Sequence, residues 1–181
     1  MAYFSIVKGS YKSRDAIFNL IRYITNPMKN PYCISNRTHA CNADAYKTAK
    51  CFENVQIYWR KENGKRIRHF HLDFSPNEHL NYSDLNYIGY KIIDYFANYQ
   101  IVFALHEFDN DGLPCHKHLH FALNPINYHT GKRYRLNKRQ LVKLRLFIEQ
   151  ILFEYGITFE GFRETRSPIL PDNIAPYAIQ H

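Results

Sequence analysis

Three histidines alternate with other residues in one short segment, and this alternation constrains the fold more than any other feature of the chain. They are His116, His118 and His120 in CHKHLHFALN. In a β-strand, side chains two positions apart point to the same face of the sheet. A strand over residues 116–124 therefore gathers the three imidazoles on one surface and turns Leu119 to the other. Imidazoles arranged in this way are typical ligands of a divalent metal ion.

Strand geometry limits how many of these histidines can bind one ion. Residues two apart lie roughly 6.6 Å apart along a strand, and residues four apart lie about 13 Å apart. Ligand nitrogens must come within about 2.1 Å of a zinc-like ion. His116 and His120 therefore cannot easily share an ion, whereas His118 can pair with either of them.

A fourth histidine, His106, ends the apolar segment IVFALH, which predicts a strand over residues 101–106. The loop that follows is short enough for a hairpin with the histidine strand. Whether His106 then meets His118 and His120 depends on a register that the sequence does not give. A site of three imidazoles would leave coordination positions open, as a catalytic ion requires.

The rest of the pattern predicts one α+β domain with a central, mostly antiparallel sheet. Strands are expected at residues 2–8, 55–60, 67–75, 101–106 and 116–124, with the second and third joined as a hairpin through the Asn63-Gly64 turn. Helices are expected at residues 15–24, 43–52, 84–97 and 137–155, with Ser83 capping the third and Gly156 ending the last.

The strand at residues 67–75 predicts that the two faces of the sheet differ, one apolar and one polar. His69, His71 and Asp73 share one face of this strand, while Phe70 and Leu72 share the other. We therefore expect the helices to pack on one face of the sheet, the apolar one. The opposite face, which carries the histidines and the aspartate, is expected to hold the functional site.

Composition is consistent with an intracellular partner of nucleic acid. The 181 residues fit one domain, and the net charge of +8 suits a polyanionic partner. Fifteen tyrosines and thirteen phenylalanines supply rings on which unpaired bases can stack. The four cysteines lack C-x-x-C spacing, which favours reduced thiols. No segment reaches the length of a signal peptide or a membrane span, so we expect a cytoplasmic protein.

Three motifs, in order, resemble those of conjugative and mobilisation relaxases in the HUH endonuclease superfamily. RYITNPMKN resembles the N-terminal motif with the nucleophilic tyrosine, and HFHLDFSPNE resembles the strand and turn before the histidine motif. HKHLHFALNPIN followed by TGKRY resembles the histidine motif itself. The resemblance extends more weakly from Ser5 to Phe159, and it implies site- and strand-specific nicking of single-stranded DNA at an origin of transfer.

The resemblance also assigns roles to residues. It makes Tyr23 the nucleophile that forms a 5′-phosphotyrosyl intermediate, with Tyr3, Tyr11 and Tyr32 as competitors. The metal ligands that it implies are His106, His118 and His120, and His116 becomes an accessory group. Asp73 is expected to accept the tyrosine proton or to orient a ligand imidazole, unless it is an ordinary solvated residue. Candidate phosphate contacts are Arg22, Lys29, Lys132, Arg133 and Arg135.

Imidazole ligands favour Mn²⁺, Zn²⁺, Co²⁺ or Ni²⁺ in affinity, although availability favours Mn²⁺ or Mg²⁺ as the working ion. Relaxases of this kind act with other transfer-complex proteins and often continue into further domains. We therefore expect a relaxase domain at residues 1–163 and an irregular tail at residues 164–181 that could begin a further region.

Two alternatives stay open. Replication-initiation and transposition nucleases of the same superfamily usually place the tyrosine after the histidines, where Tyr134 and Tyr155 are available. A non-catalytic nucleic-acid-binding module could use the same sheet, with the histidines holding a structural metal or none.

Overall fold

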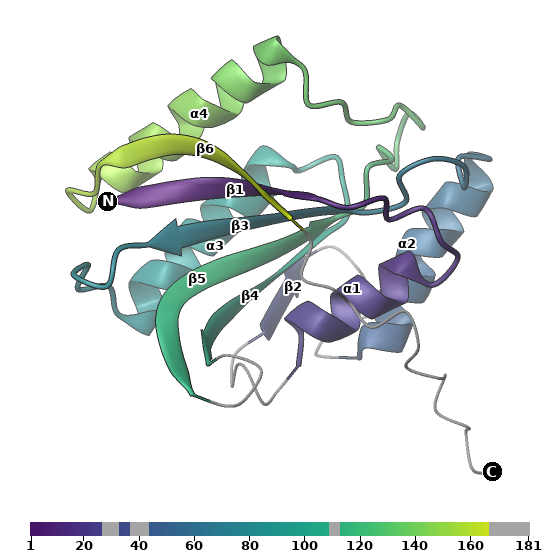
Figure 1. The fold of residues 1–181 in the computed structure, drawn as a ribbon. Helices are drawn as coiled ribbons and strands as arrows, with labels where there is room; N and C mark the ends of the chain where they lie inside the picture. The colour runs from purple at the N-terminus through teal and green to yellow at the C-terminus, as the bar shows by residue number, and fades with distance from the viewer. Residues whose placement is uncertain (27–32, 37–43, 109–112, 167–181) are drawn as a thin grey trace.

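The computed structural model describes residues 1–26, 33–36, 44–108 and 113–166, and Figure 1 shows their α+β arrangement around one sheet. The elements are β1 (Ala2–Lys8), α1 (Ala16–Ile24), β2 (Cys33–Asn36), α2 (Ala45–Tyr58), β3 (Arg68–Phe74), α3 (Tyr82–Tyr95), β4 (Ile101–Phe108), β5 (Pro114–Leu123), α4 (Lys138–Phe153) and β6 (Phe159–Arg166). The six strands lie in the order β2-β4-β5-β3-β1-β6. All neighbours are antiparallel except β1 and β6. The predicted α+β fold with a mostly antiparallel sheet is therefore confirmed.

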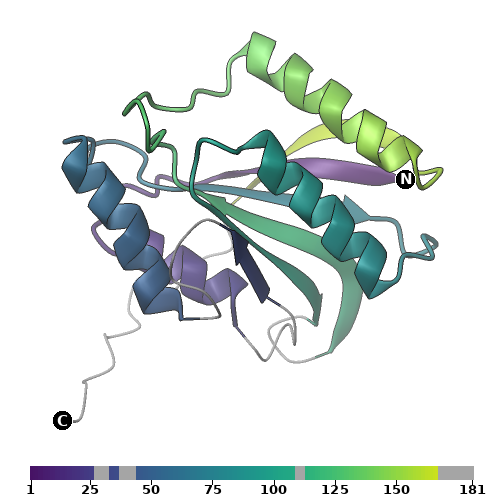
Figure 2. The ribbon, with the colours of Figure 1, turned by 180° about the vertical axis from the view of Figure 1, so that it is seen from behind.

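One face of the sheet is apolar and is covered by α3 and α4, which Figure 2 shows from behind. Large side chains of the strands are fully buried there, because alternate residues of each strand face the same helices. Those on the sheet include Phe4, Phe70, Leu72, Phe103, Leu119 and Phe121. This arrangement confirms the predicted apolar face and the helices packed on it.

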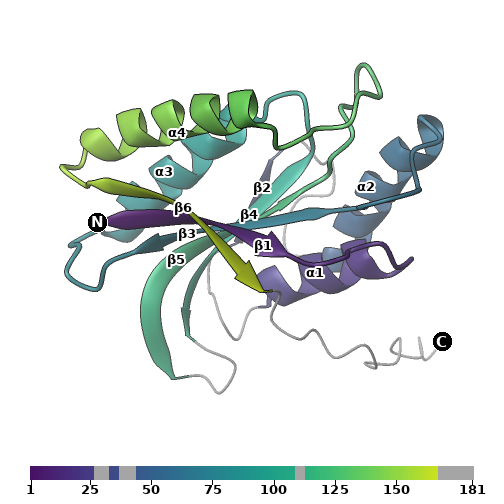
Figure 3. The same cartoon turned by 45° about the horizontal axis from the view of Figure 1, so that its top comes forward.

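The opposite face also carries helices, which corrects the expectation of helices on one face alone. Figure 3 shows α1 on the other side of the sheet from α3 and α4. The apolar stripe of α1, which includes Leu20 and Ile24, packs with Phe52 of α2 against Val102 and Ala122 of the sheet. The physical reason is that β4 and β5 carry small apolar residues beyond the histidines on this face, so a second core forms there.

The hairpin predicted from residues 55–60 is wrong, because residues 55–58 form the last turn of α2. Short apolar runs do not distinguish a strand from a buried helix segment. Here the deciding residue is Gln56, which is fully buried and donates to the carbonyl of Arg66 and to the side chain of Asn124. In turn, Asn124 donates to the carbonyl of Phe52. This buried network ties α2 to the sheet as a helix.

The predicted boundaries of α1, α3 and α4 hold within two residues, whereas α2 ends six residues later than predicted. One helix has a different cap. Asn81, rather than Ser83, caps α3 and forms a capping box with Asp84. Asn137 caps α4, and Gly156 follows its end with a φ of +66°, as predicted for a C-terminal glycine.

The strand β6 was not predicted, since FEGFRETR lacks a regular apolar alternation. It pairs in parallel with β1 at the edge of the sheet, where charged side chains are tolerated. The domain boundary proposed at residue 163 lies within this strand, and the tail at residues 167–181 lies outside the described residues. Within the described part of the chain, none of the helices has the length and apolarity needed to cross a membrane.

Candidate metal and tyrosine site

The register of β4 and β5 brings three of the predicted histidines together. His106 lies directly opposite His118, and His120 lies opposite Ala104, one step along the same face. One ring nitrogen from each of His106, His118 and His120 lies within 4.8 Å of the others. We call these residues the inner triad. The register that the sequence left open is thus the one in which a single ion can contact all three imidazoles.

Each imidazole of the inner triad is held through one ring nitrogen. Nε2 of His106 donates to the carbonyl oxygen of Ile24 at 2.8 Å, and Nδ1 of His118 donates to that of His116 at 2.8 Å. Nδ1 of His120 lies 2.8 Å from Nε2 of His69. Partners of this kind fix the ring orientation and tautomer of metal-binding histidines.

A buried chain of polar groups lies behind His120, and no sequence motif predicts it. Nδ1 of His69 lies 3.1 Å from the hydroxyl of Tyr11, and His69 is 1% exposed. The available signal was the alternation of His69 with His71 on one strand face. Tyr11, which the sequence offers as a competing nucleophile, lies behind the ligand candidates and contacts His69.

Burial keeps the imidazoles neutral. It lowers the pKa of His118 to about 4 and holds the pKa of His69 and His120 well below the ordinary value of 6.5. The neighbouring histidines act in the same direction for His69 and His120. Metal ligation requires the neutral ring, so the inner triad fits a divalent ion in geometry, and His118 and His120 also fit it in protonation state.

Tyr23 lies beside the inner triad, in the last turn of α1. Its ring centroid is 5.9 Å from that of His106 and 5.7 Å from that of His120, in edge-on arrangements. It also lies 6.3 Å from the ring of His69. Burial, followed by the nearby thiol of Cys115, raises the pKa of the Tyr23 hydroxyl. Packing of α1 on the sheet is what brings this tyrosine to histidines far away in the sequence.

The competing tyrosines have other surroundings. The ring of Tyr3 is covered by the guanidinium of Arg163, whose carbon lies 3.0 Å from the ring centroid. Tyr11 lies behind the histidines, as described above, and Tyr32 lies outside the described residues. The downstream candidates Tyr134 and Tyr155 pack with the apolar core of α3 and α4, on the face of the sheet away from the histidines.

Asp73 lies in β3 directly opposite His118. Its carboxylate accepts hydrogen bonds from His71 Nδ1 and from the hydroxyl of Ser5, each at 2.8 Å. Burial alone would raise the pKa of Asp73, but the hydrogen bond and charge of His71 and the hydrogen bond from Ser5 lower it overall. The carboxylate is therefore ionised at neutral pH. It lies 3.6 Å from Nε2 of His116.

The candidate phosphate contacts do not all lie near the histidines. Arg22, next to Tyr23 in α1, places its guanidinium over the ring of Phe18. Lys132, Arg133 and Arg135 follow the far end of β5, beyond Leu123. Arg133 there donates to three backbone carbonyl oxygens, those of Lys61, Asn63 and Lys65. Lys29 lies outside the described residues.

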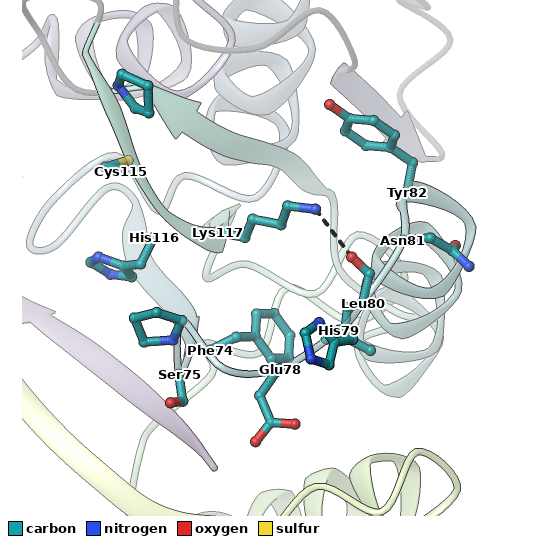
Figure 4. Close-up of a pocket in the computed structure, with 12 residues that line it drawn as sticks. Phe74, Ser75, Glu78, His79, Leu80, Asn81, Tyr82, Cys115, His116 and Lys117 are labelled. Carbon is teal, nitrogen blue, oxygen red and sulfur yellow. Dashed lines mark hydrogen bonds between the residues drawn. The ribbon is translucent and has the colours of Figure 1, made fainter.

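A cavity of about 770 Å³ opens next to the histidines, between the start of β5 and the connection from β3 to α3 (Figure 4). His116, His79 and Lys117 contribute to its lining. The ammonium of Lys117 donates to the carbonyl oxygen of Leu80 and lies over the ring of Tyr82. The cavity therefore lies at the exposed end of the histidine strand, and His118 and His120 are not part of its lining.

Comparison with known proteins gives one family. Residues 23–157 match the family model described as "Relaxase: MobA/VirD2-like, nuclease domain". One similar protein is Protein rlx of Staphylococcus aureus, 28% identical over 119 residues, which are 65% of this chain and 35% of that protein. Another Protein rlx of the same organism is 28% identical over 135 residues, which are 74% of this chain and 40% of the relative. The aligned chain thus spans well under half of these relatives. No solved structure matches the chain significantly.

Proposed function

Because the chain belongs to the MobA/VirD2-like relaxase nuclease family, we propose that it nicks single-stranded DNA at an origin of transfer. The cut would be site- and strand-specific, and would serve conjugative transfer or mobilisation of a plasmid or transposon. The observation that supports this reaction most strongly is the contact of Tyr23 with the inner triad. A nucleophile and a phosphate-activating centre must lie together for phosphodiester transfer.

Tyr23 is proposed as the nucleophile. Its hydroxyl oxygen forms a bond to phosphorus while the bond from phosphorus to the 3′-oxygen breaks, which leaves a 3′-hydroxyl and a 5′-phosphotyrosyl link. The link keeps the energy of the broken bond, so the 3′-hydroxyl can reverse the reaction. Because burial raises the pKa of Tyr23, its hydroxyl is protonated at neutral pH; this proton leaves during attack, and the departing 3′-oxygen takes up one proton to become the 3′-hydroxyl.

His106, His118 and His120 are proposed to hold a divalent ion. When bound, such an ion neutralises charge on the scissile phosphate and aligns it for in-line displacement. The protein side of this arrangement consists of imidazoles oriented by hydrogen bonds with Ile24, His116 and His69. We propose Mn²⁺ or Mg²⁺ as the ion in use, with Zn²⁺, Co²⁺ or Ni²⁺ able to occupy the same ligands.

Of the two roles considered for Asp73, the contacts support orientation of neighbouring imidazoles. Its carboxylate accepts from His71 and lies opposite His118. His116 is proposed as an accessory group at the exposed end of the same strand face.

DNA binding is proposed to extend from this site over basic side chains. Arg22 lies nearest the nucleophile in sequence, while Lys132 and Arg135 are exposed beyond the far end of β5. Lys29 is proposed as well, since it follows the tyrosine motif. We also propose that the protein contacts other transfer-complex proteins and acts in the cytoplasm. Its catalytic domain is proposed to span residues 1–163.

The superfamily alternative with a downstream tyrosine is less well supported. Tyr134 is 6% exposed and packs beside Phe96, on the apolar face of the sheet. Tyr155 packs against the same core and lies 6.4 Å from the ring of Tyr87. To reach a phosphate at the inner triad, either ring would have to cross the sheet.

The reaction class can be tested directly. The protein is incubated with Mn²⁺ and single-stranded fragments of its source DNA, and the products are separated under denaturing conditions. We expect a covalent protein–DNA species and a free 3′-hydroxyl on the released fragment, both lost when the ion is chelated. DNA retention without any covalent species would instead favour a non-catalytic binding module.

A further inference from the structure

A second group of candidate ligands lies on the solvent side of the inner triad. It comprises Asp73, His116 and His118, and one ligand atom from each lies within 4.8 Å of the others. We call these residues the outer cluster. The side chain of His116 is 49% exposed and that of Asp73 is 17% exposed, whereas His106 and His120 are buried. The outer cluster is therefore the more accessible of the two groups.

His118 belongs to both groups but can serve only one ion at a time. Its Nδ1 donates to the carbonyl oxygen of His116, so Nε2 carries the lone pair that can bind a metal. The two groups consequently define alternative positions for one ion on either side of His118, rather than a pair of ions held together. The rings of His116 and His118 lie 5.1 Å apart, and those of His118 and His120 lie 4.7 Å apart.

The donor atoms of the two groups differ in charge and hardness. The inner triad offers three neutral imidazoles, while the outer cluster offers two imidazoles and one carboxylate. A carboxylate adds negative charge and a hard oxygen donor, which suit Mn²⁺ better than an all-nitrogen site does. Hydrogen bonds from Ser5 and His71 leave each oxygen of Asp73 with a further lone pair for an ion.

From these observations we propose that Asp73, His116 and His118 form an outer divalent-cation position, through which Mn²⁺ reaches the inner triad. Because His116 and Asp73 are more exposed than His106 and His120, an ion arriving from solvent would meet the outer cluster first. It would then exchange Asp73 and His116 for His106 and His120 while keeping His118. The proposal rests on the divalent ion proposed above for the inner triad, but it concerns ion binding alone and does not depend on the nicking reaction.

The test uses Mn²⁺ titrations followed by electron paramagnetic resonance, with the full chain and no DNA. His106→Gln removes one inner imidazole but keeps a side-chain donor for the carbonyl of Ile24. We expect this variant to retain Mn²⁺ binding at the outer cluster. Adding His116→Ala or Asp73→Asn to it should weaken that residual binding by about tenfold or more. The matched control adds His79→Ala, an exposed histidine of the same cavity, and should leave binding unchanged.

Two outcomes would overturn the proposal. One is a His106→Gln protein that no longer binds Mn²⁺. The other is a residual Mn²⁺ affinity in His106→Gln that neither His116→Ala nor Asp73→Asn changes. Should His106→Gln fail to fold, as thermal melting would reveal, Mn²⁺ uptake can be timed in the single variants by stopped flow. His116→Ala should then load several-fold more slowly than the unaltered protein and than His79→Ala. Equal loading rates would also overturn the proposal.

Discussion

The ring of Tyr23 stands edge-on to the ring of His120, with 5.7 Å between the centroids and 82° between the planes. The two residues come from different layers of the molecule, since Tyr23 belongs to α1 and His120 to β5. Their contact depends on the packing of α1 against the small apolar residues Val102 and Ala122. The site is therefore a product of tertiary packing, and its parts can be perturbed separately.

Removal of a ligand imidazole should abolish tight metal binding without unfolding the protein. We expect His120→Ala to lower Mn²⁺ affinity by about a hundredfold or more, and Tyr11→Phe, which alters only the group behind His69, by about tenfold. Calorimetric titration measures both. His129→Ala, at an exposed position away from the site, is the control and should bind normally. Unchanged affinity in His120→Ala would remove this residue from the ligand set.

The metal-free protein should lose stability as the pH falls from about 6.5 to about 4. Burial lowers the pKa of His118 to about 4 and that of His69 and His120 well below 6.5. Within this window the unfolded chain binds protons that the folded protein does not, so the free energy of unfolding decreases as the pH falls. Each such group contributes about 1.4 kcal/mol per pH unit.

Urea unfolding of the metal-free protein at about pH 7 and about pH 5 measures this effect. His118→Gln, which cannot take up the proton, should show a shallower dependence than the unaltered protein. Equal free energies of unfolding at the two pH values would contradict the neutral, buried state of these imidazoles.

Packing of α3 on the sheet predicts that Gly89 does not tolerate a side chain. A Cβ added to Gly89 would collide with the ring of Phe103 in β4. Helix propensity alone favours alanine by about 1 kcal/mol, but overpacking of a core costs about 1–3 kcal/mol. We expect Gly89→Ala to lower the free energy of unfolding, as measured in urea. A stabilised variant would show that α3 lies farther from β4 than described.

Substitution of Arg133 and of Arg135 should have different effects, one on stability and the other on DNA binding. Because Arg133 donates to three backbone carbonyl oxygens, Arg133→Ala should cost about 1–2 kcal/mol of stability. Arg135 is exposed, so Arg135→Ala should leave stability unchanged and weaken DNA binding, with a smaller salt dependence. Melting curves and salt-dependent DNA titrations distinguish the two effects. The reverse pattern would assign Arg133 to the DNA interface.

Local pattern was enough to predict much of the site. Alternation placed His116, His118 and His120 on one strand face, and the motif resemblance pointed to Tyr23 and His106. Their meeting could not be derived, because the register of β4 and β5 and the docking of α1 depend on contacts between distant segments. The role of His69 was missed for the same reason, since its partners Tyr11 and His120 lie on other elements.

The errors in the fold arose where tertiary contacts override local signals. The segment at residues 55–60 has a strand-like composition, yet Gln56 is satisfied only as part of a buried network with Arg66 and Asn124. The strand β6 could not be predicted from apolar alternation, because an edge strand beside β1 does not require a regular apolar face. The carbonyl oxygens that accept from Arg133 could not be predicted either, because they belong to a distant segment at residues 61–65.

The most direct test of the account is to locate the covalent link. After reaction with single-stranded DNA and Mn²⁺, the adduct is digested with nuclease and protease, and the nucleotide-bearing peptide is identified by mass spectrometry. We predict a nucleotide on Tyr23. Tyr23→Phe should lose the adduct completely while it retains DNA binding. Tyr3→Phe should form as much adduct on Tyr23 as the unaltered protein does. An adduct on another residue, or one that persists in Tyr23→Phe, would contradict the assignment of Tyr23 as the nucleophile.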